Sequence, residues 1–193
     1  MAQTMGIRSF IAISLGETAI QNLRVVAERK KILDQFKAIS WVYPKNYHLT
    51  LSFLGNLQSD KLDDLQLKLT DLTLNYHPFD ISMEIVCGFP FHQKPTTISA
   101  IISKSDELLI LHDQITNMVS SLKIPINKKV FKPHVTLGRI KRKINLEKII
   151  EPSQILIKSN VNSVDLYHSE LKSSGPIYSL IFTQEFLGKI TSH

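Results

Sequence analysis

Hydrophobic and polar residues alternate with a period of two in several short stretches, and with a helical period in the segments between them. The first kind of pattern predicts strands at residues 8–15, 48–55, 79–89, 96–103, 134–140, 163–171 and 176–186. The second kind predicts long helices within 16–36, 60–75 and 105–122, and a short helix within 145–152. Strands mixed with helices in this way indicate an α+β protein.

The predicted elements occur in one order twice: a strand, a long helix, a strand containing His-x-Thr, a helix and a strand. We therefore predict one domain over residues 1–193, built as a bilobal pseudo-twofold duplication with lobes of roughly 1–90 and 91–175. Each lobe is expected to be an antiparallel sheet with helices on its outer face, and the active-site cleft is expected between the lobes. The remaining strand, 176–186, is expected to join one of the sheets.

Two strands with the same polar residues anchor this interpretation. "HLTLSFLG" begins at His48 and "HVTLGRI" begins at His134. Side chains two positions apart in a strand point to the same face. His48 with Thr50, and His134 with Thr136, therefore form two equal pairs, which a twofold axis between the strands would bring to opposite sides of one cleft.

Two such pairs suit displacement at phosphorus. A histidine exchanges protons near neutral pH, so one ring can serve as a base and the other as an acid. Threonine hydroxyls beside them can donate to phosphate oxygens, and neither proton transfer needs a metal. A single strand histidine is more often structural, but two matching His-x-Thr-Leu strings favour catalysis. Neither motif has the spacing of a metal site, and the remaining histidines are expected to be structural or at the surface: His77, His92, His112, His168 and His193.

Composition narrows the class of protein. An apolar content of 43% and a charged content of 21% are typical of a globular domain, and the net charge of +6 favours an anionic partner such as nucleic acid. Cys87 is the only cysteine, which excludes an intramolecular disulfide and a multi-cysteine zinc site, and we expect it to be buried. The apolar run near the N-terminus is short and is interrupted by Glu17, and no window is long enough to span a membrane. The expected location is the cytoplasm, away from membranes.

Four stretches, "RSFIAI", "NYHLTLSFLG", "FKPHVTLGRI" and "YHSELKSSGPIYSLI", span nearly the whole chain and resemble one family. The chain is similar to the two-histidine phosphoesterases, specifically the 2'-5' RNA ligase-like branch of RNA 2',3'-cyclic phosphodiesterases. The resemblance implies a bilobal fold and hydrolysis of a terminal 2',3'-cyclic phosphate on RNA, leaving a 2'-phosphate, without a metal or other cofactor. It implies that His48 and His134 are the catalytic pair and that Thr50 and Thr136 bind phosphate.

The same resemblance suggests roles for further residues. By analogy His48 is the acid for the leaving 3'-oxygen and His134 is the base for water, although a symmetric site lets the two exchange roles. Arg139 lies on the opposite face of a regular strand, but Gly138 allows a bulge or bend that would turn it into the cleft, where it would contact phosphate. Phe131 and Tyr178 are candidates for stacking on the terminal base, and each can also be a core residue.

The expected partners are RNA ends carrying a 2',3'-cyclic phosphate, with tRNA fragments as one source, and no obligate protein partner. The basic residues near the second motif either form a solvated face or guide RNA: Lys128, Lys129, Lys132, Lys141, Arg142 and Lys143. Reversible ligation of RNA through 2'-5' linkages is also part of the resemblance. Two alternatives stay open: a phosphodiesterase of small cyclic nucleotides or ADP-ribose derivatives, and a non-catalytic RNA-binding module.

Overall fold

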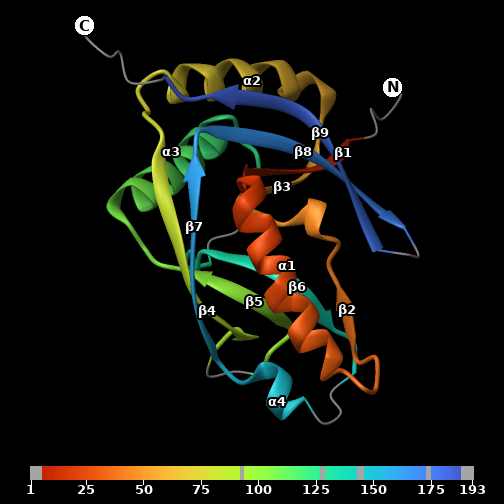
Figure 1. The fold of residues 1–193 in the computed structure, drawn as a ribbon. Coiled ribbons are helices and arrows are strands. Elements are labelled where there is room, and N and C mark those ends of the chain that lie inside the picture. The colour runs from red at the N-terminus through yellow and green to blue at the C-terminus, as the bar shows by residue number, and fades with distance from the viewer. Residues whose placement is uncertain (1–5, 92–93, 127–128, 143–145, 173–174, 188–193) are drawn as a thin grey trace, which may run out of the picture.

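A computed structural model describes residues 6–91, 94–126, 129–142, 146–172 and 175–187 (Figure 1). Its strands are β1 (Ile7–Ser14), β2 (Ile39–Trp41), β3 (His48–Leu57), β4 (Phe79–Phe89), β5 (Thr97–Ile102), β6 (His134–Ile140), β7 (Ser153–Val161), β8 (Ser163–Lys172) and β9 (Gly175–Glu185). Its helices are α1 (Glu17–Ile32), α2 (Ser59–Thr73), α3 (Asp106–Ser121) and α4 (Glu147–Ile150), with a 3-10 turn, η1 (Pro44–Asn46).

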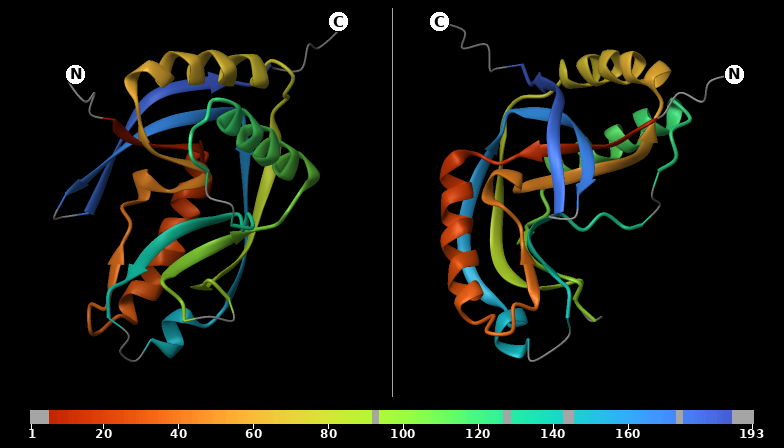
Figure 2. Two further views of the ribbon diagram at one scale, coloured as in Figure 1. Left: turned by 180° about the vertical axis from the view of Figure 1, so that it is seen from behind. Right: turned by 90° about the vertical axis from the view of Figure 1, so that its right-hand side faces the viewer.

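The strands of the described ranges form one curved sheet in the order β7-β4-β5-β6-β3-β1-β8-β9, with β2 added beside β6. Every pairing is antiparallel, so the predicted α+β class with antiparallel strands is confirmed. Helices α2 and α3 lie against the part that contains β3 and β9, and α1 and α4 lie against the part that contains β4, β6 and β7 (Figure 2). Their apolar faces complete the core.

The two parts of the sheet are not the contiguous ranges predicted from the sequence. β4 pairs with β5 and β7, whereas β8 pairs with β1 and β9. Each part therefore contains strands from both halves of the chain, and the boundaries 1–90 and 91–175 are corrected to β1, β3, β8 and β9 on one side and β2 and β4–β7 on the other. Sequence order alone does not reveal this exchange, because the pairing of β1 with β8 joins opposite ends of the chain.

Two strands were missing from the prediction. β2 has only three residues, too few to show a period of two. In β7 the alternation is hidden by the run Ile155-Leu156-Ile157, whose middle residue faces solvent and is 75% exposed. β7 pairs with β4 and takes the place in the duplicated order that the prediction gave to 163–171.

Two buried polar side chains hold the C-terminal end of α1 against its neighbours, Asp34 towards β2 and Lys30 towards α4. Asp34 accepts hydrogen bonds from the backbone nitrogens of Ala38 (2.8 Å) and Ile39 (3.0 Å) and so holds the turn into β2. Lys30 donates from Nζ to the carbonyl oxygens of Ile149 and Glu151, both at 2.9 Å. These carbonyls lie at the end of α4, where no intrahelical donor reaches them, so Lys30 joins the last turn of α1 to α4.

Both motif strands carry a β-bulge directly after the threonine. On β6, Thr136 and Gly138 pair with adjacent residues of β5, so Leu137 is an extra residue. On β3, Thr50 and Ser52 pair with adjacent residues of β1, so Leu51 is an extra residue. An inserted residue reverses the alternation of the side chains that follow it. The two strands therefore share a structural irregularity as well as a sequence motif.

Gly138 allows β2 to lie close to the bulge in β6. It pairs with Trp41, and a Cβ atom at Gly138 would lie 2.6 Å from Ile39 Cγ2 and 3.1 Å from Trp41 Cε3. The first distance is too short for two carbon atoms, so any larger residue must displace the Ile39 side chain.

We expect Gly138→Ala to lower the free energy of unfolding by about 1–3 kcal/mol, the usual cost of forcing extra volume into a packed site. Urea denaturation measures this change. In an Ile39→Ala background the clashing Cγ2 atom is gone, so the cost of Gly138→Ala should fall there, whereas Ile39→Val keeps Cγ2 and should preserve it. Equal costs in all three backgrounds would show that this contact is not the reason for glycine.

Candidate active site

The two motifs meet where β3 pairs with β6, with Leu49 opposite Val135. Both of these side chains are buried in the core, at 1% and 0% exposure. Because side chains alternate, His48 and Thr50 share the other face with His134 and Thr136, and all four are partly exposed. The antiparallel pair of β3 and β6 has a local twofold axis between Leu49 and Val135. Rotation about this axis exchanges the two histidines with each other and the two threonines with each other. Each histidine is thus placed beside the threonine of the other strand.

Both histidine rings are held in the same way. His48 Nδ1 lies 2.7 Å from the carbonyl oxygen of Asn46, and His134 Nδ1 lies 2.7 Å from the carbonyl oxygen of Lys132. A carbonyl oxygen only accepts, so Nδ1 carries the proton of each neutral ring and Nε2 keeps its lone pair. Nε2 of His48 is 3.1 Å from Thr50 Oγ1, which can donate to it. Each Nε2 atom is therefore the one available for proton transfer.

Burial lowers the pKa of both histidines below the ordinary value. For each ring, loss of solvent is the largest cause, and the hydrogen bond to the backbone carbonyl acts in the opposite direction. The positive charge of Arg139 lowers both values further, and the charge on a protonated His134 also lowers the pKa of His48. The two rings therefore resist being protonated at the same time.

The bulge in β6 decides where Arg139 lies. In a regular strand Arg139 would face away from His134, but the extra residue returns it to the histidine face, where it is exposed and its charge acts on both rings. The structure therefore brings Arg139 together with the histidines and threonines.

The same reasoning places Phe53 as the counterpart of Arg139. It follows His48 by five residues, as Arg139 follows His134, and it is 58% exposed. Its ring centroid is 6.3 Å from that of Phe10, whose ring in turn lies 4.9 Å from His48. The sequence prediction missed Phe53, although its position in "HLTLSFLG" matches that of Arg139 in "HVTLGRI".

The two aromatic candidates lie in different surroundings. Tyr178 on β9 is partly exposed and meets the His48 ring edge-on, with centroids 5.3 Å apart and planes at 90°. Phe131 stacks on His112 of α3, with centroids 3.9 Å apart and planes at 9°, and packs against the core. The structure therefore brings Tyr178 to the histidines and gives Phe131 a different partner.

The basic residues near β6 point outward. Lys129, Lys132, Lys141 and Arg142 are exposed, and Arg142 donates from Nη2 to the carbonyl oxygen of Phe36 at 2.9 Å. Lys128, Lys143, His92 and His193 lie outside the described residues. Cys87 is buried, as predicted.

A partly buried hydrogen-bond network behind His48, centred on the buried Asp165, was not expected from the sequence. Ser14, which pairs with His48 across β1 and β3, donates to Asp165 Oδ2 at 2.5 Å, so its Oγ can accept from the Tyr167 hydroxyl at 2.7 Å. Thr183 donates to the other carboxylate oxygen of Asp165 at 2.8 Å. The Tyr167 ring stacks on Phe10, with centroids 5.3 Å apart, and so the network fixes the aromatic layer on which His48 lies.

The described residues contain neither a metal-binding group of side chains nor a membrane-spanning helix. No group of three or more His, Cys, Asp and Glu side chains within these ranges could hold a metal ion. None of the helices in the described part of the chain is long and apolar enough to cross a membrane.

Comparison with known proteins agrees with this geometry. Residues 15–98 match the family described as LigT like Phosphoesterase. An RNA 2',3'-cyclic phosphodiesterase of Thermotoga maritima is 28% identical over 94% of this chain and 96% of its own length. An enzyme of the same name from Aquifex aeolicus is 29% identical over 91% and 95%.

Solved structures share the fold. A protein of Thermus thermophilus is 27% identical with a TM-score of 0.81, over 95% of this chain and 100% of that one. Escherichia coli LigT, solved in complex with 3'-AMP, is 18% identical with a TM-score of 0.77, over 94% and 98%. Together with the family match over residues 15–98 and the near full-length relatives, this likeness shows that the chain is similar to the LigT-like phosphoesterases in sequence and in fold.

Proposed function

We propose that this protein hydrolyses the terminal 2',3'-cyclic phosphate of RNA and leaves a 2'-phosphate. The observation that supports this most directly is the pair of histidines on one face of β3 and β6, each holding its Nδ1 proton on a backbone carbonyl and presenting Nε2. Relatives that align over nearly their whole length are named RNA 2',3'-cyclic phosphodiesterases. RNA ends, including those of tRNA fragments, are the proposed substrates.

The reaction is an in-line displacement at phosphorus. Nε2 of His134 takes a proton from water, whose oxygen forms a bond to phosphorus while the bond from phosphorus to the 3'-oxygen breaks. Protonated His48 gives its Nε2 proton to the departing 3'-oxygen. The products are a 3'-hydroxyl and a 2'-phosphate, and the proton returns from His134 to His48 through solvent. With the 5'-hydroxyl of a second RNA in place of water, the same forward steps join two RNA ends through a 2'-5' linkage, and their reversal cleaves that linkage.

Thr50, Thr136 and Arg139 are the proposed phosphate-binding groups. Their side chains lie on the histidine face, where hydroxyl donors and a guanidinium can hold the non-bridging oxygens as negative charge grows on them. Thr50 is already beside His48 Nε2, so a phosphate bound by Thr50 lies within reach of that nitrogen.

The terminal base has aromatic partners beside His48. Tyr178 and Phe53 are both accessible there, and stacking on such rings tolerates any base. We propose these two rings as the base platform and leave out Phe131, whose ring faces His112.

Replacing either histidine should nearly abolish hydrolysis. His48→Gln and His134→Gln should each lower kcat by between about a hundredfold and ten-thousandfold, because each removes a proton-transfer group. The assay uses an oligoribonucleotide with a 2',3'-cyclic phosphate end and identifies the product phosphate. His77→Gln is the matched control, since His77 bonds the Leu187 carbonyl outside the site. Near-normal turnover by either active-site variant would contradict the two-histidine mechanism.

The role of His48 as the acid and that of His134 as the base can be distinguished with a substrate whose 3'-oxygen is replaced by sulfur. A thiolate leaves without being protonated, so the acid is no longer needed. We expect this substrate to restore most of the activity of His48→Ala and little of that of His134→Ala. Restoration of His134→Ala instead would exchange the two assignments.

The pH profile should reflect the lowered histidine pKa values. Since the active form has one neutral and one protonated ring, and both pKa values lie below the ordinary value of about 6.5, kcat/KM should peak below about pH 6.5. It should fall as the pH rises, because the acid loses its proton, and a chelator should leave it unchanged. Arg139→Gln removes a cause of both shifts and should move the peak upward, whereas Lys141→Gln should leave it in place. A peak above pH 7 in the unmodified protein would contradict this assignment.

A further inference from the structure

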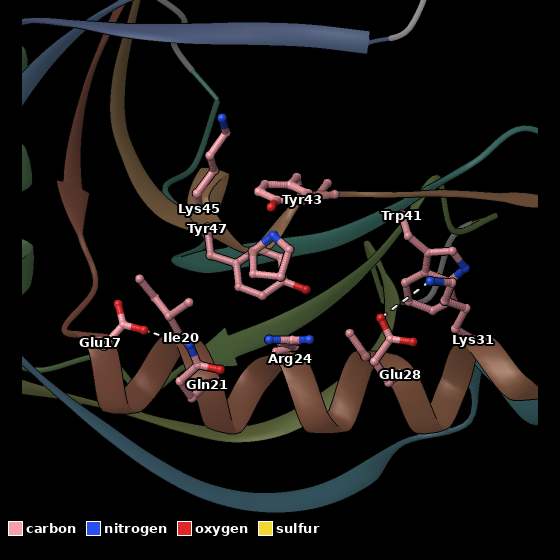
Figure 3. Close-up of a pocket in the computed structure, with 13 residues that line it drawn as sticks. Glu17, Ile20, Gln21, Arg24, Glu28, Lys31, Trp41, Tyr43, Lys45 and Tyr47 are labelled. Carbon is pink, nitrogen blue, oxygen red and sulfur yellow. Dashed lines mark hydrogen bonds and ion pairs between the residues drawn. The ribbon is translucent and has the colours of Figure 1, made fainter.

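A cavity of about 620 Å³ lies between α1 and residues 41–47, away from the histidine pair (Figure 3). Its volume is within the usual range for sites that bind small molecules. One wall is the outer face of α1, and the other is formed by the end of β2 and by η1. Residues 44–47 connect this cavity to the site already described, because they lead directly to His48.

The cavity and the histidine site are on opposite sides of this segment. Tyr47 has an extended backbone, with φ −70° and ψ 121°, so its side chain and that of His48 point in opposite directions. Tyr47 is buried and lines the cavity, whereas His48 lies against Phe10. The cavity is therefore a separate site that shares a wall with the histidine site.

The charges of the cavity leave one cation without a partner. Both carboxylates are engaged along α1: Gln21 donates to Glu17 at 2.6 Å, and Lys31 pairs with Glu28 at 3.4 Å. Arg24 lies about two turns after Glu17 and one turn before Glu28. It has no hydrogen-bond or ion-pair partner within the described part of the chain, and Figure 3 shows its guanidinium beneath the Tyr47 ring. A free guanidinium in a concave site favours an anion that it can bind with two parallel hydrogen bonds.

Tyr43 and Tyr47 line the wall of the cavity that is opposite Arg24. Tyr43 is 64% exposed, and Lys45 Nζ lies 5.3 Å from the centre of its ring. The Tyr47 hydroxyl is a second donor: burial, followed by the charge of Glu28, raises its pKa to about 12, with Arg24 acting in the opposite direction. It therefore stays protonated at physiological pH. An accessible ring beside cations and a phenol donor suits a ligand with a planar aromatic part and a phosphate.

We propose that this cavity binds a nucleotide, with the base stacked on Tyr43 and the phosphate bound by Arg24 and the Tyr47 hydroxyl. The ligand is a free nucleoside monophosphate or one nucleotide unit of a longer RNA, since both present the same chemistry. The proposal does not depend on the hydrolytic reaction, because nucleotide binding to the cavity can be measured with ligands that carry no cyclic phosphate to hydrolyse.

Trp41 provides a direct signal, since it lines the cavity and is the only tryptophan of the chain. Adenosine 5'-monophosphate, an oligoribonucleotide ending in a 3'-hydroxyl, and inorganic phosphate are titrated separately while indole emission is recorded. We expect a saturable change with one or both nucleotide probes at concentrations where phosphate alone has no effect. Tighter binding of the monophosphate would identify a free nucleotide as the ligand, and tighter binding of the oligonucleotide would identify RNA.

Variants locate the binding. Arg24→Gln and Tyr43→Ala should each weaken nucleotide binding about tenfold or more, because each removes a charged or a stacking contact. Tyr43→Phe keeps the ring and should bind almost normally. Arg29→Gln makes the same charge change as Arg24→Gln on the same helix but outside the cavity, and should have no effect.

Hydrolysis of a mononucleoside 2',3'-cyclic phosphate is measured on the same variants, to separate this site from the histidine site. Arg24→Gln and Tyr43→Ala should keep the parent kcat, which shows that they are folded. The proposal is overturned if neither nucleotide probe gives a saturable change, or if Arg24→Gln and Tyr43→Ala bind the nucleotide as tightly as the parent protein. The latter result would place the nucleotide in the histidine site instead.

Discussion

The pairing of Leu49 with Val135 is the contact on which the arrangement of the site depends. It is the position at which β3 pairs with β6, in the middle of the sheet, and both side chains are buried. A slip of one residue in either strand would turn its histidine into the core and its apolar neighbours into solvent. Burial of each large aliphatic side chain contributes roughly 1.5–3 kcal/mol, so hydrophobic burial sets the register that places His48 beside Thr136 and His134 beside Thr50.

The two half-sites are alike in backbone and unlike in side chains. Each histidine bonds to the carbonyl two residues before it, and each motif is followed by a bulge. Beyond each bulge, one side chain faces the histidines again, and its chemical type differs between the strands: it is Phe53 on β3 and Arg139 on β6. The His48 side therefore has an aromatic layer, whereas the His134 side carries positive charge. In the mechanism proposed here, the similar halves supply two proton-transfer groups, and this difference would give an asymmetric substrate one preferred orientation.

The parts of the site that follow from local periodicity were predictable, and those that depend on pairing between distant segments were not. The shared face of His48 with Thr50, and of His134 with Thr136, follows from alternation within one strand. The α+β class follows from the same patterns. The contact of Ser14 with Asp165 joins opposite ends of the chain, and no local pattern reveals it. The bulge that redirects Arg139 was foreseen only as one of two alternatives, because Gly138 permits a bulge without requiring one.

The exchange of strands between the two parts of the sheet affects how the chain can fold as it is synthesised. β1 is made first, yet one of its edges pairs with β8, where Phe10 lies opposite Tyr167. Until β8 is made, that edge has no partner and the aromatic layer under His48 is incomplete. Neither half of the chain contains a complete part of the sheet, so the fold should form late and as one cooperative unit. The face that carries the two histidines is therefore completed only when almost the whole polypeptide is available.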